Sequence, residues 1–144
     1  MDRLKVLIAS EMPEERALVR RALDQRRDVG RLLEAEDGVT AHLAARAEPF
    51  DLAVVSSSLG KIDGLTLVRT LVRAPASRGV RTLLLLGRDA AARMREVITA
   101  RPSALIVRPF DEFLFLARFD QALAADAPAP FAARVAAGGD LSLK

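Results

Sequence analysis

Several apolar runs of the sequence stop at residues whose side chains can do chemistry. Ser10 and Glu11 follow one run, three serines from Ser56 follow another, and Arg108 follows a third. Hydroxyl, carboxylate and guanidinium groups can serve nucleophilic catalysis, hold a divalent cation or bind phosphate. A serine nucleophile also needs an adjacent base, and the only histidine, His42, lies in a separate segment. The residue types alone leave these chemistries open.

The three serines from Ser56 to Ser58 have two interpretations. They can cradle an anion with their hydroxyl and backbone N–H groups near a helix start. A phosphate-binding loop has more glycines and a lysine directly before the helix, so the pattern favours a solvated loop. Without a base or a set of oxyanion donors, the serines do not predict catalysis. His42 lacks further metal ligands around it in the sequence, and we predict no metal site.

The composition is that of a single globular domain. The chain has 144 residues, of which 51% are apolar and 28% charged, with a net charge of +3. No apolar run approaches the length of a membrane span, and the N-terminus lacks the pattern of a secretory signal. The cytoplasm is therefore the expected location, without membrane contact. The absence of cysteines excludes disulfides and thiolate metal sites, and the small positive excess does not indicate DNA binding.

Short apolar runs, separated by segments with helical spacing, predict the fold. The runs are Lys5–Ala9, Leu32–Ala35, Leu52–Val55, Thr82–Leu86 and Leu105–Val107. Most of them are nearly continuous rather than alternating, which is typical of parallel strands covered on both faces. The strand–helix order predicts an α/β, flavodoxin-like, doubly wound five-stranded parallel sheet in the order 2-1-3-4-5 with five helices. Its ligand crevice is expected at the carboxyl ends of strands one and three.

Start signals and apolar stripes define the expected helices. Pro13 begins the first helix, and Asp63, Asp89 and Asp111 can cap the third, fourth and fifth. The inward side chains are expected to include Ala41, Leu43 and Ala44 in a helix over Val39–Ala47, Leu65, Leu67, Val68, Leu71 and Val72 in the third helix, and Met94, Val97 and Ile98 in the fourth. Residues 1–124 form the predicted domain. From residue 125 the proline-, glycine- and alanine-rich sequence predicts a tail or linker.

Short motifs at the predicted strand ends resemble those of the receiver domain of bacterial response regulators. They are VLIASEMP at the end of the first strand, EAEDG after the second, DGLTLVRTL at the start of the third helix and VRPF after the fifth strand. The spacings from Ser56 to Leu86 and to Arg108 also match the family without a gap. The resemblance extends from Leu4 to Ala124. It implies the receiver fold and a role in two-component signalling.

The resemblance also implies which residues occupy the family's phosphorylation pocket. In receivers an aspartate ending strand three accepts a phosphoryl group, and carboxylates after strand one help to hold a divalent metal. A threonine or serine ending strand four reports the modification, and a lysine follows strand five. The corresponding residues here are Ser56, Ser10 with Glu11, Leu86 and Arg108. The replacements predict a degenerate receiver, or pseudo-receiver, which is not an enzyme and needs no cofactor.

Two further expectations concern Arg108. Its guanidinium keeps the positive charge of the family's lysine, and with Glu11 nearby it is expected to form an internal ion pair across the vacated pocket. Such a pair would plug the pocket rather than catalyse a reaction. The resemblance further predicts that the Arg108–Pro109 peptide is cis, a form accessible to X–Pro bonds.

Arginines on the first helix form one candidate contact surface. Arg16, Arg20 and Arg27 fall close to one face of that helix. The face is either simply solvated or a contact for a phosphate-rich ligand or an acidic partner. The second interpretation would make the chain an arginine-mediated sensor of a nucleotide second messenger, such as a cyclic dinucleotide.

The fifth helix is apolar over more than half of its circumference. Phe113 and Leu123 lie on one stripe, and Phe115 and Phe119 lie on a second. A surface helix needs only one apolar stripe, so the extra one is covered either by the tail or by a partner. Receivers as a family interact through the helix 4–strand 5–helix 5 face. We therefore predict a phosphorylation-independent module that binds a signalling protein of unknown identity, or a second copy as a homodimer, through this face.

Overall fold

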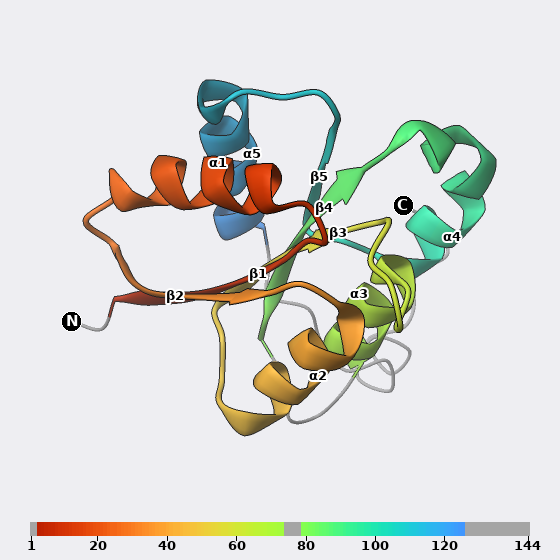
Figure 1. Cartoon of the computed structure of the whole chain (residues 1–144), viewed down its shortest axis with the longest axis horizontal. Helices are drawn as coiled ribbons and strands as arrows, with labels where there is room; N and C mark the ends of the chain where they lie inside the picture. The colour runs from red at the N-terminus through yellow and green to blue at the C-terminus, as the bar shows by residue number, and fades with distance from the viewer. Residues whose placement is uncertain (1–2, 74–78, 126–144) are drawn as a thin grey trace, which may run out of the picture.

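A five-stranded parallel sheet with helices on both faces forms the body of the molecule (Figure 1). The computed structural model describes residues 3–73 and 79–125. The strand order is β2-β1-β3-β4-β5, which confirms the predicted doubly wound, flavodoxin-like topology.

The strands begin and end close to the predicted positions. They are β1 (Leu4–Ala9), β2 (Val29–Ala35), β3 (Leu52–Ser56), β4 (Arg81–Leu86) and β5 (Ala104–Val107). β3 is buried along its whole length, and β1 and β4 are buried over their last four and five residues, as continuous apolar runs predict. β5 differs because it is an edge strand. Its Leu105 and Val107 side chains are 38% and 55% exposed.

The helices are α1 (Pro13–Asp24), α2 (Gly38–Ala47), α3 (Gly64–Arg73), α4 (Met94–Ala100) and α5 (Glu112–Ala124), with a 3-10 helix, η2 (Arg88–Arg93), before α4. Three predicted start signals are confirmed. Pro13 opens α1, the Asp63 carboxylate accepts a hydrogen bond from the backbone N–H of Leu65 at 3.1 Å, and the Asp111 carboxylate accepts one from Leu114 at 2.8 Å. These bonds satisfy backbone donors that a helix start leaves unpaired.

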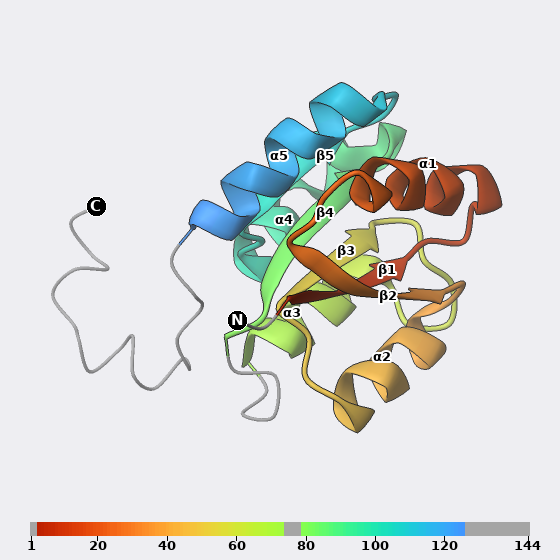
Figure 2. The ribbon, with the colours of Figure 1, turned by 90° about the vertical axis from the view of Figure 1, so that its left-hand side faces the viewer.

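Two helical layers bury the two faces of the sheet. α1 and α5 pack side by side on one face, while α2, α3 and α4 cover the other (Figures 1 and 2). Val54 and Leu83 pack in the cluster that contains Phe119, and Val55 lies in the cluster that contains Leu67. Alternate residues of the central strands therefore supply two separate cores.

Three predictions about the helices are wrong. Asp89 lies inside η2, and Arg93 rather than Asp89 occupies the N-cap position of α4. α4 has about two turns, and its buried residues are Val97 and Ala100. Ile98, expected to point inward, is 69% exposed, and Met94 is 42% exposed. On α2 the small residues Ala41, Ala44 and Ala45 face the core, which turns Leu43 outward to 61% exposure.

The described chain ends just after α5. Ala125 accepts a hydrogen bond from the Arg81 side chain at 3.0 Å, which ties the end of α5 to the start of β4. The predicted tail from residue 125 lies outside the described residues beyond this point. Within the described ranges, no helix has the length and apolar character needed to span a membrane.

Candidate functional site

Four strand ends bring the predicted pocket residues to one edge of the sheet. Ser10 follows β1, Ser56 ends β3, Leu86 ends β4 and Arg108 follows β5. The strands are parallel, so these ends meet at the same edge, where doubly wound folds hold their ligands. Backbone bonds continue past the strands and fix the positions, because the Arg108 N–H donates to the Leu86 carbonyl at 3.0 Å.

A bidentate ion pair crosses this pocket. Arg108 Nε donates to one Glu15 carboxylate oxygen at 2.6 Å, and a terminal nitrogen of the same guanidinium donates to the other at 2.8 Å. The Glu15 side chain is 5% exposed and the Arg108 side chain 18%. Ser10, which is fully buried, donates its hydroxyl proton to Glu15 at 2.7 Å. The predicted ion pair across the pocket is present, but its carboxylate is Glu15, in the first turn of α1, and not Glu11.

The sequence contained a weak signal for Glu15. Glu14 and Glu15 follow Pro13 in the first turn of α1, where acidic residues are common because they complement the helix dipole. That ordinary explanation hid the role of Glu15. The Glu15 side chain points back over the strand ends, and the Arg108 side chain is long enough to reach it and form the ion pair.

Ser56 is held by donors on two sides. It is completely buried, and its hydroxyl oxygen accepts hydrogen bonds from Arg108 at 2.7 Å and from the backbone N–H of Ser58 at 3.1 Å. Arg108 also donates to the Ser58 hydroxyl at 3.2 Å. The Ser57 hydroxyl accepts from the Gly87 N–H at 3.2 Å. In the described residues, the hydrogen bonds of these three hydroxyls therefore tie neighbouring loops together.

Glu11 keeps a carboxylate at a position where the receiver resemblance implies a metal ligand in the family. One of its carboxylate oxygens is buried and has no hydrogen-bond partner among the described residues. A divalent cation such as Mg²⁺ prefers octahedral oxygen ligation that includes carboxylates. Here the second carboxylate, Glu15, is taken by Arg108, which also brings a fixed positive charge to Ser56. The donor set therefore does not fit a divalent cation.

A second ion pair fixes the loop after β3. Both terminal nitrogens of Arg93 donate to the Asp63 carboxylate, at 2.8 and 2.7 Å, and one of them also reaches the Ser57 carbonyl at 3.5 Å. These bonds, with Arg93 as the main cause, hold the pKa of Asp63 below its usual value of 3.8. The same pairing raises the pKa of Arg93. Asp63 thus remains ionised while it caps α3.

No family model matches the sequence, and no curated protein sequence is significantly similar to it. Solved structures do match. The chemotaxis response regulator CheY4 of Vibrio cholerae has a TM-score of 0.75 at 19% identity, over 84% of this chain and 99% of that one. The REC domain of AraT, a response regulator from Geobacillus stearothermophilus, has a TM-score of 0.71 at 25% identity, over 83% and 92%. A signal receiver domain of a histidine kinase from Syntrophus aciditrophicus has a TM-score of 0.75 at 16% identity, over 84% and 90%.

This chain has the fold of a response-regulator receiver domain. Its strand-end edge is therefore the edge that the sequence resemblance assigned to phosphorylation. At that edge the receiver fold here carries Ser56, Leu86 and the Arg108–Glu15 pair. Leu86 is 1% exposed and its side chain has no hydroxyl group. The Arg108–Pro109 peptide is cis, as predicted.

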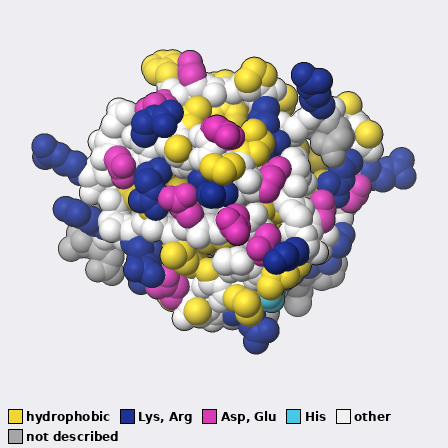
Figure 3. Space-filling model, in the orientation of Figure 1, with side chains coloured by type: hydrophobic (Ala, Val, Ile, Leu, Met, Phe, Trp, Pro, Cys, Tyr) yellow, Lys and Arg dark blue, Asp and Glu magenta, His cyan; other side chains and the backbone are white. Residues whose placement is uncertain are grey.

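The arginines predicted as anion contacts are placed differently from one another. Arg16 and Arg20, on α1, both donate to the carboxylate of Glu34 on β2. Arg16 also donates to the Ser10 carbonyl at 2.7 Å. Arg27 lies beyond the end of α1, in the turn that leads to β2, so its predicted place on the helix is wrong. Figure 3 shows basic and acidic side chains interspersed over the visible face. This surface therefore gains no support as an anion site.

The aromatic residues of α5 also separate into two groups. Phe115 and Phe119 are fully buried between α1 and the sheet, so the prediction that they form an interface is wrong. Their rings lie 6.0 Å apart, and the Arg26 guanidinium lies 5.3 Å from the centre of the Phe119 ring. Leu123 is half-buried beside the same core. Phe113, at the start of α5, is 84% exposed and remains an interface candidate.

Proposed function

We propose that this chain is a receiver-like signalling module that acts by protein–protein interaction and without phosphorylation of its own pocket. The observation that carries the proposal is the bidentate Arg108–Glu15 pair at the strand ends. The pair occupies the place where the receiver fold would otherwise receive a phosphoryl group. It also leaves Ser56 buried beneath a guanidinium, away from solvent.

The side chains around the pair support the loss of phosphorylation. Ser56 has a hydroxyl in place of a carboxylate, and that hydroxyl accepts hydrogen bonds from Arg108 and Ser58. A serine nucleophile needs a base that accepts its proton. Among the described residues, no carboxylate or imidazole accepts a hydrogen bond from Ser56, Ser57 or Ser58. We therefore infer that the module is not an enzyme.

The residue at the end of β4, Leu86, has no hydroxyl group that could report a modification. Leu86 packs in the core cluster that lies on the α3 and α4 side of the sheet. An apolar side chain at this position cannot form a hydrogen bond to a phosphoryl group, so occupancy of the pocket would not be passed on through it. We therefore infer that partners bind this module in a single conformation that phosphorylation does not change.

The surface available to partners is apolar on the α4–β5 side. Four of the exposed large apolar residues of the described chain lie there: Met94 and Ile98 on α4, and Leu105 and Val107 on β5, which we call the α4–β5 surface. Met12, Val39 and Leu43 are exposed elsewhere. Phe113 lies at the start of α5, close in sequence to the end of β5. Exposed apolar groups on an edge strand are typical of surfaces that another chain covers. We propose a partner protein as the occupant.

A capture experiment with matched variants tests this function. The immobilised chain is exposed to extract of its own cells with and without acetyl phosphate and Mg²⁺. We expect the same partner in both conditions, and a loss of about tenfold or more in its affinity for Val107→Glu, because a buried unpaired charge weakens an interface strongly. Leu43→Glu, on the exposed side of α2, should bind as the natural chain does. Binding that needs the phosphodonor, or that both variants lose equally, contradicts the proposal.

A further inference from the structure

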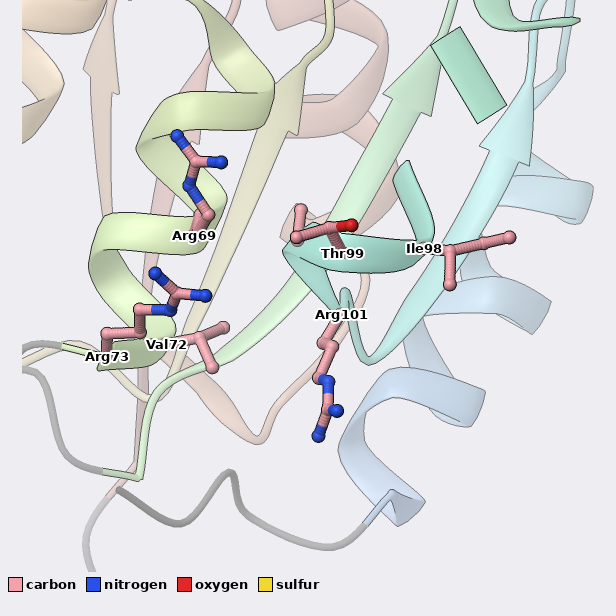
Figure 4. Close-up of a pocket in the computed structure, with 7 residues that line it drawn as sticks. Arg69, Val72, Arg73, Ile98, Thr99 and Arg101 are labelled. Atoms are coloured by element: carbon pink, nitrogen blue, oxygen red, sulfur yellow. The ribbon is translucent and has the colours of Figure 1, made fainter. Parts of the chain in front are cut away.

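Three arginines from two elements line one pocket. Arg69 and Arg73 lie one turn apart on α3, and Arg101 is the residue that follows α4. The cavity between them has a volume of about 230 Å³. Figure 4 shows Arg69 and Arg73 projecting from α3 on one side and Arg101 from beyond the end of α4 on the other. The pocket is therefore bordered by positive charge on two sides.

These arginines differ from many others in having no carboxylate partner among residues 3–73 and 79–125. Ion pairs to carboxylates engage Arg16, Arg20, Arg21, Arg26, Arg31, Arg93 and Arg108. Within the described part of the chain, none of the three pocket arginines forms one. Glu96 lies near enough for the charge of Arg69 to contribute to lowering its pKa, but Arg93 is the main cause. Both Glu96 oxygens already accept hydrogen bonds from Arg93. The positive charges of the pocket are left for an external anion.

The backbone conformation of Arg101 also supports an anion site at this pocket. Arg101 ends α4 in the left-handed conformation, with φ 58° and ψ 56°. Glycine adopts this conformation without cost at a helix end, whereas a residue with a side chain is mildly strained there. The strain is tolerated at a position that places a guanidinium beside the pocket.

Apart from Thr99, whose hydroxyl donates to the Arg95 carbonyl, the remaining lining is apolar. Val72 and Ala100 are nearly buried, at 6% and 2% exposure, and form the wall against the core, while Ile98 is 69% exposed at the margin. Guanidinium groups bind phosphate oxygens in a bidentate way and stack on flat rings, and aliphatic side chains give such rings an apolar contact. The lining thus combines groups for phosphate with groups for a ring.

We propose that this pocket binds a small phosphate-bearing ligand of the nucleotide class. Arg69, Arg73 and Arg101 hold the phosphate groups, and Val72 and Ile98 contact the ring. The cavity is smaller than the roughly 300 Å³ at which enclosed small-molecule sites usually begin, so part of the ligand stays in solvent. The site is separate from the Arg108–Glu15 pair. It shares Ile98 with the α4–β5 surface, but its argument does not rest on the function proposed above.

Calorimetric titration of the full chain tests the site with defined probes. The probes are GTP, cyclic di-GMP and pyrophosphate, at about 0.15 M salt because charge-based binding is screened. We expect at least one nucleotide probe to bind with a Kd on the order of 10 to 100 μM, and pyrophosphate, which lacks a ring, to bind about tenfold more weakly. Arg73→Gln and Arg101→Gln should each raise the Kd about tenfold, as loss of a charge-assisted contact does.

Arg46→Gln is the matched control. Arg46 is exposed in the last turn of α2, as Arg73 is in the last turn of α3, and its variant should bind as the natural chain does. Circular dichroism melting checks that each variant is folded. A Kd weaker than about 1 mM for both nucleotides, or equal weakening by Arg46→Gln and Arg73→Gln, overturns the proposal. Pyrophosphate binding as tight as that of the nucleotides overturns the ring contact and the nucleotide assignment with it.

Discussion

Arg108 brings a positive charge to the edge of the sheet where Ser10 and Ser56 are completely buried. Taking a charge out of water is costly, and the cost is offset only when a partner and good hydrogen-bond geometry compensate it. Glu15 supplies both, with two short bonds and a further hydrogen bond from Ser10. The pair thus makes the pocket a hydrogen-bonded polar cluster.

This cluster predicts how single substitutions change stability. Glu15→Gln removes the carboxylate charge and leaves Arg108 without its partner, so we expect the free energy of unfolding to fall by about 3 kcal/mol, as for other broken buried pairs. Urea denaturation measures the change. The double variant Glu15→Gln/Arg108→Met should lose less than the sum of the two single variants.

An exposed pair provides the comparison for that measurement. Arg21 and Glu112 link α1 to α5 with side chains that are 61% and 34% exposed. Arg21→Gln should therefore cost less than about 1 kcal/mol, because surface ion pairs contribute little. Equal losses for Glu15→Gln and Arg21→Gln would show that the pocket pair is not a structural plug.

At the scale of elements, α5 shows where sequence patterns succeed and fail. The position of the helix and its Asp111 cap follow from local signals that the chain carries within a few residues. Which of its two apolar stripes is buried depends on where α1 and the sheet lie, and no local pattern contains that information. The same limit applies to Glu15, whose partner Arg108 is distant in sequence and is reached only through the sheet.

The burial of α5 predicts opposite effects for two phenylalanines. Phe119→Ala should lower the free energy of unfolding by about 3 to 5 kcal/mol, because it leaves a cavity in the core. Phe113→Ala should change it by less than about 0.5 kcal/mol, because that ring is exposed. Thermal and urea unfolding of both variants compare the two directly. Similar losses of unfolding free energy for the two variants would contradict the finding that Phe119 is buried and Phe113 exposed.

The Asp63–Arg93 pair at the start of α3 predicts that the free energy of unfolding falls in acid. The pKa of Asp63 is lower in the folded chain than its usual value of 3.8, chiefly through Arg93. Its contribution to stability is therefore complete above that usual value and is lost as the pH falls through the lower, folded value. Asp63→Asn should be less stable at neutral pH and should change less between about pH 6 and pH 2.

Urea unfolding across this pH range makes the acid test quantitative. Asp24→Asn, at the exposed end of α1, is the control that removes a carboxylate outside the pair. It should keep the pH dependence of the natural chain. If Asp63→Asn keeps that dependence as well, the Asp63–Arg93 pair is not the cause of the loss of stability in acid.

At the scale of the whole molecule, the fold and the chemistry have different determinants. The apolar runs and helix starts predicted the doubly wound parallel sheet and its strand order. The pocket residues Ser10, Ser56, Leu86 and Arg108 were also placed correctly at one edge, because parallel strands end together. The surfaces were less predictable, since exposure of Ile98 and Val107 depends on how little of β5 the short α4 covers.

The central claim is that this receiver fold works without accepting a phosphoryl group. The chain is incubated with acetyl phosphate and Mg²⁺, and intact-protein mass spectrometry is recorded at neutral pH, beside a phosphorylatable receiver domain treated in the same way. We predict an unchanged mass for this chain, because Ser56 is buried under Arg108 and has no base. A phosphoryl adduct on this chain, lost on mild hydrolysis as in the control domain, would contradict the account.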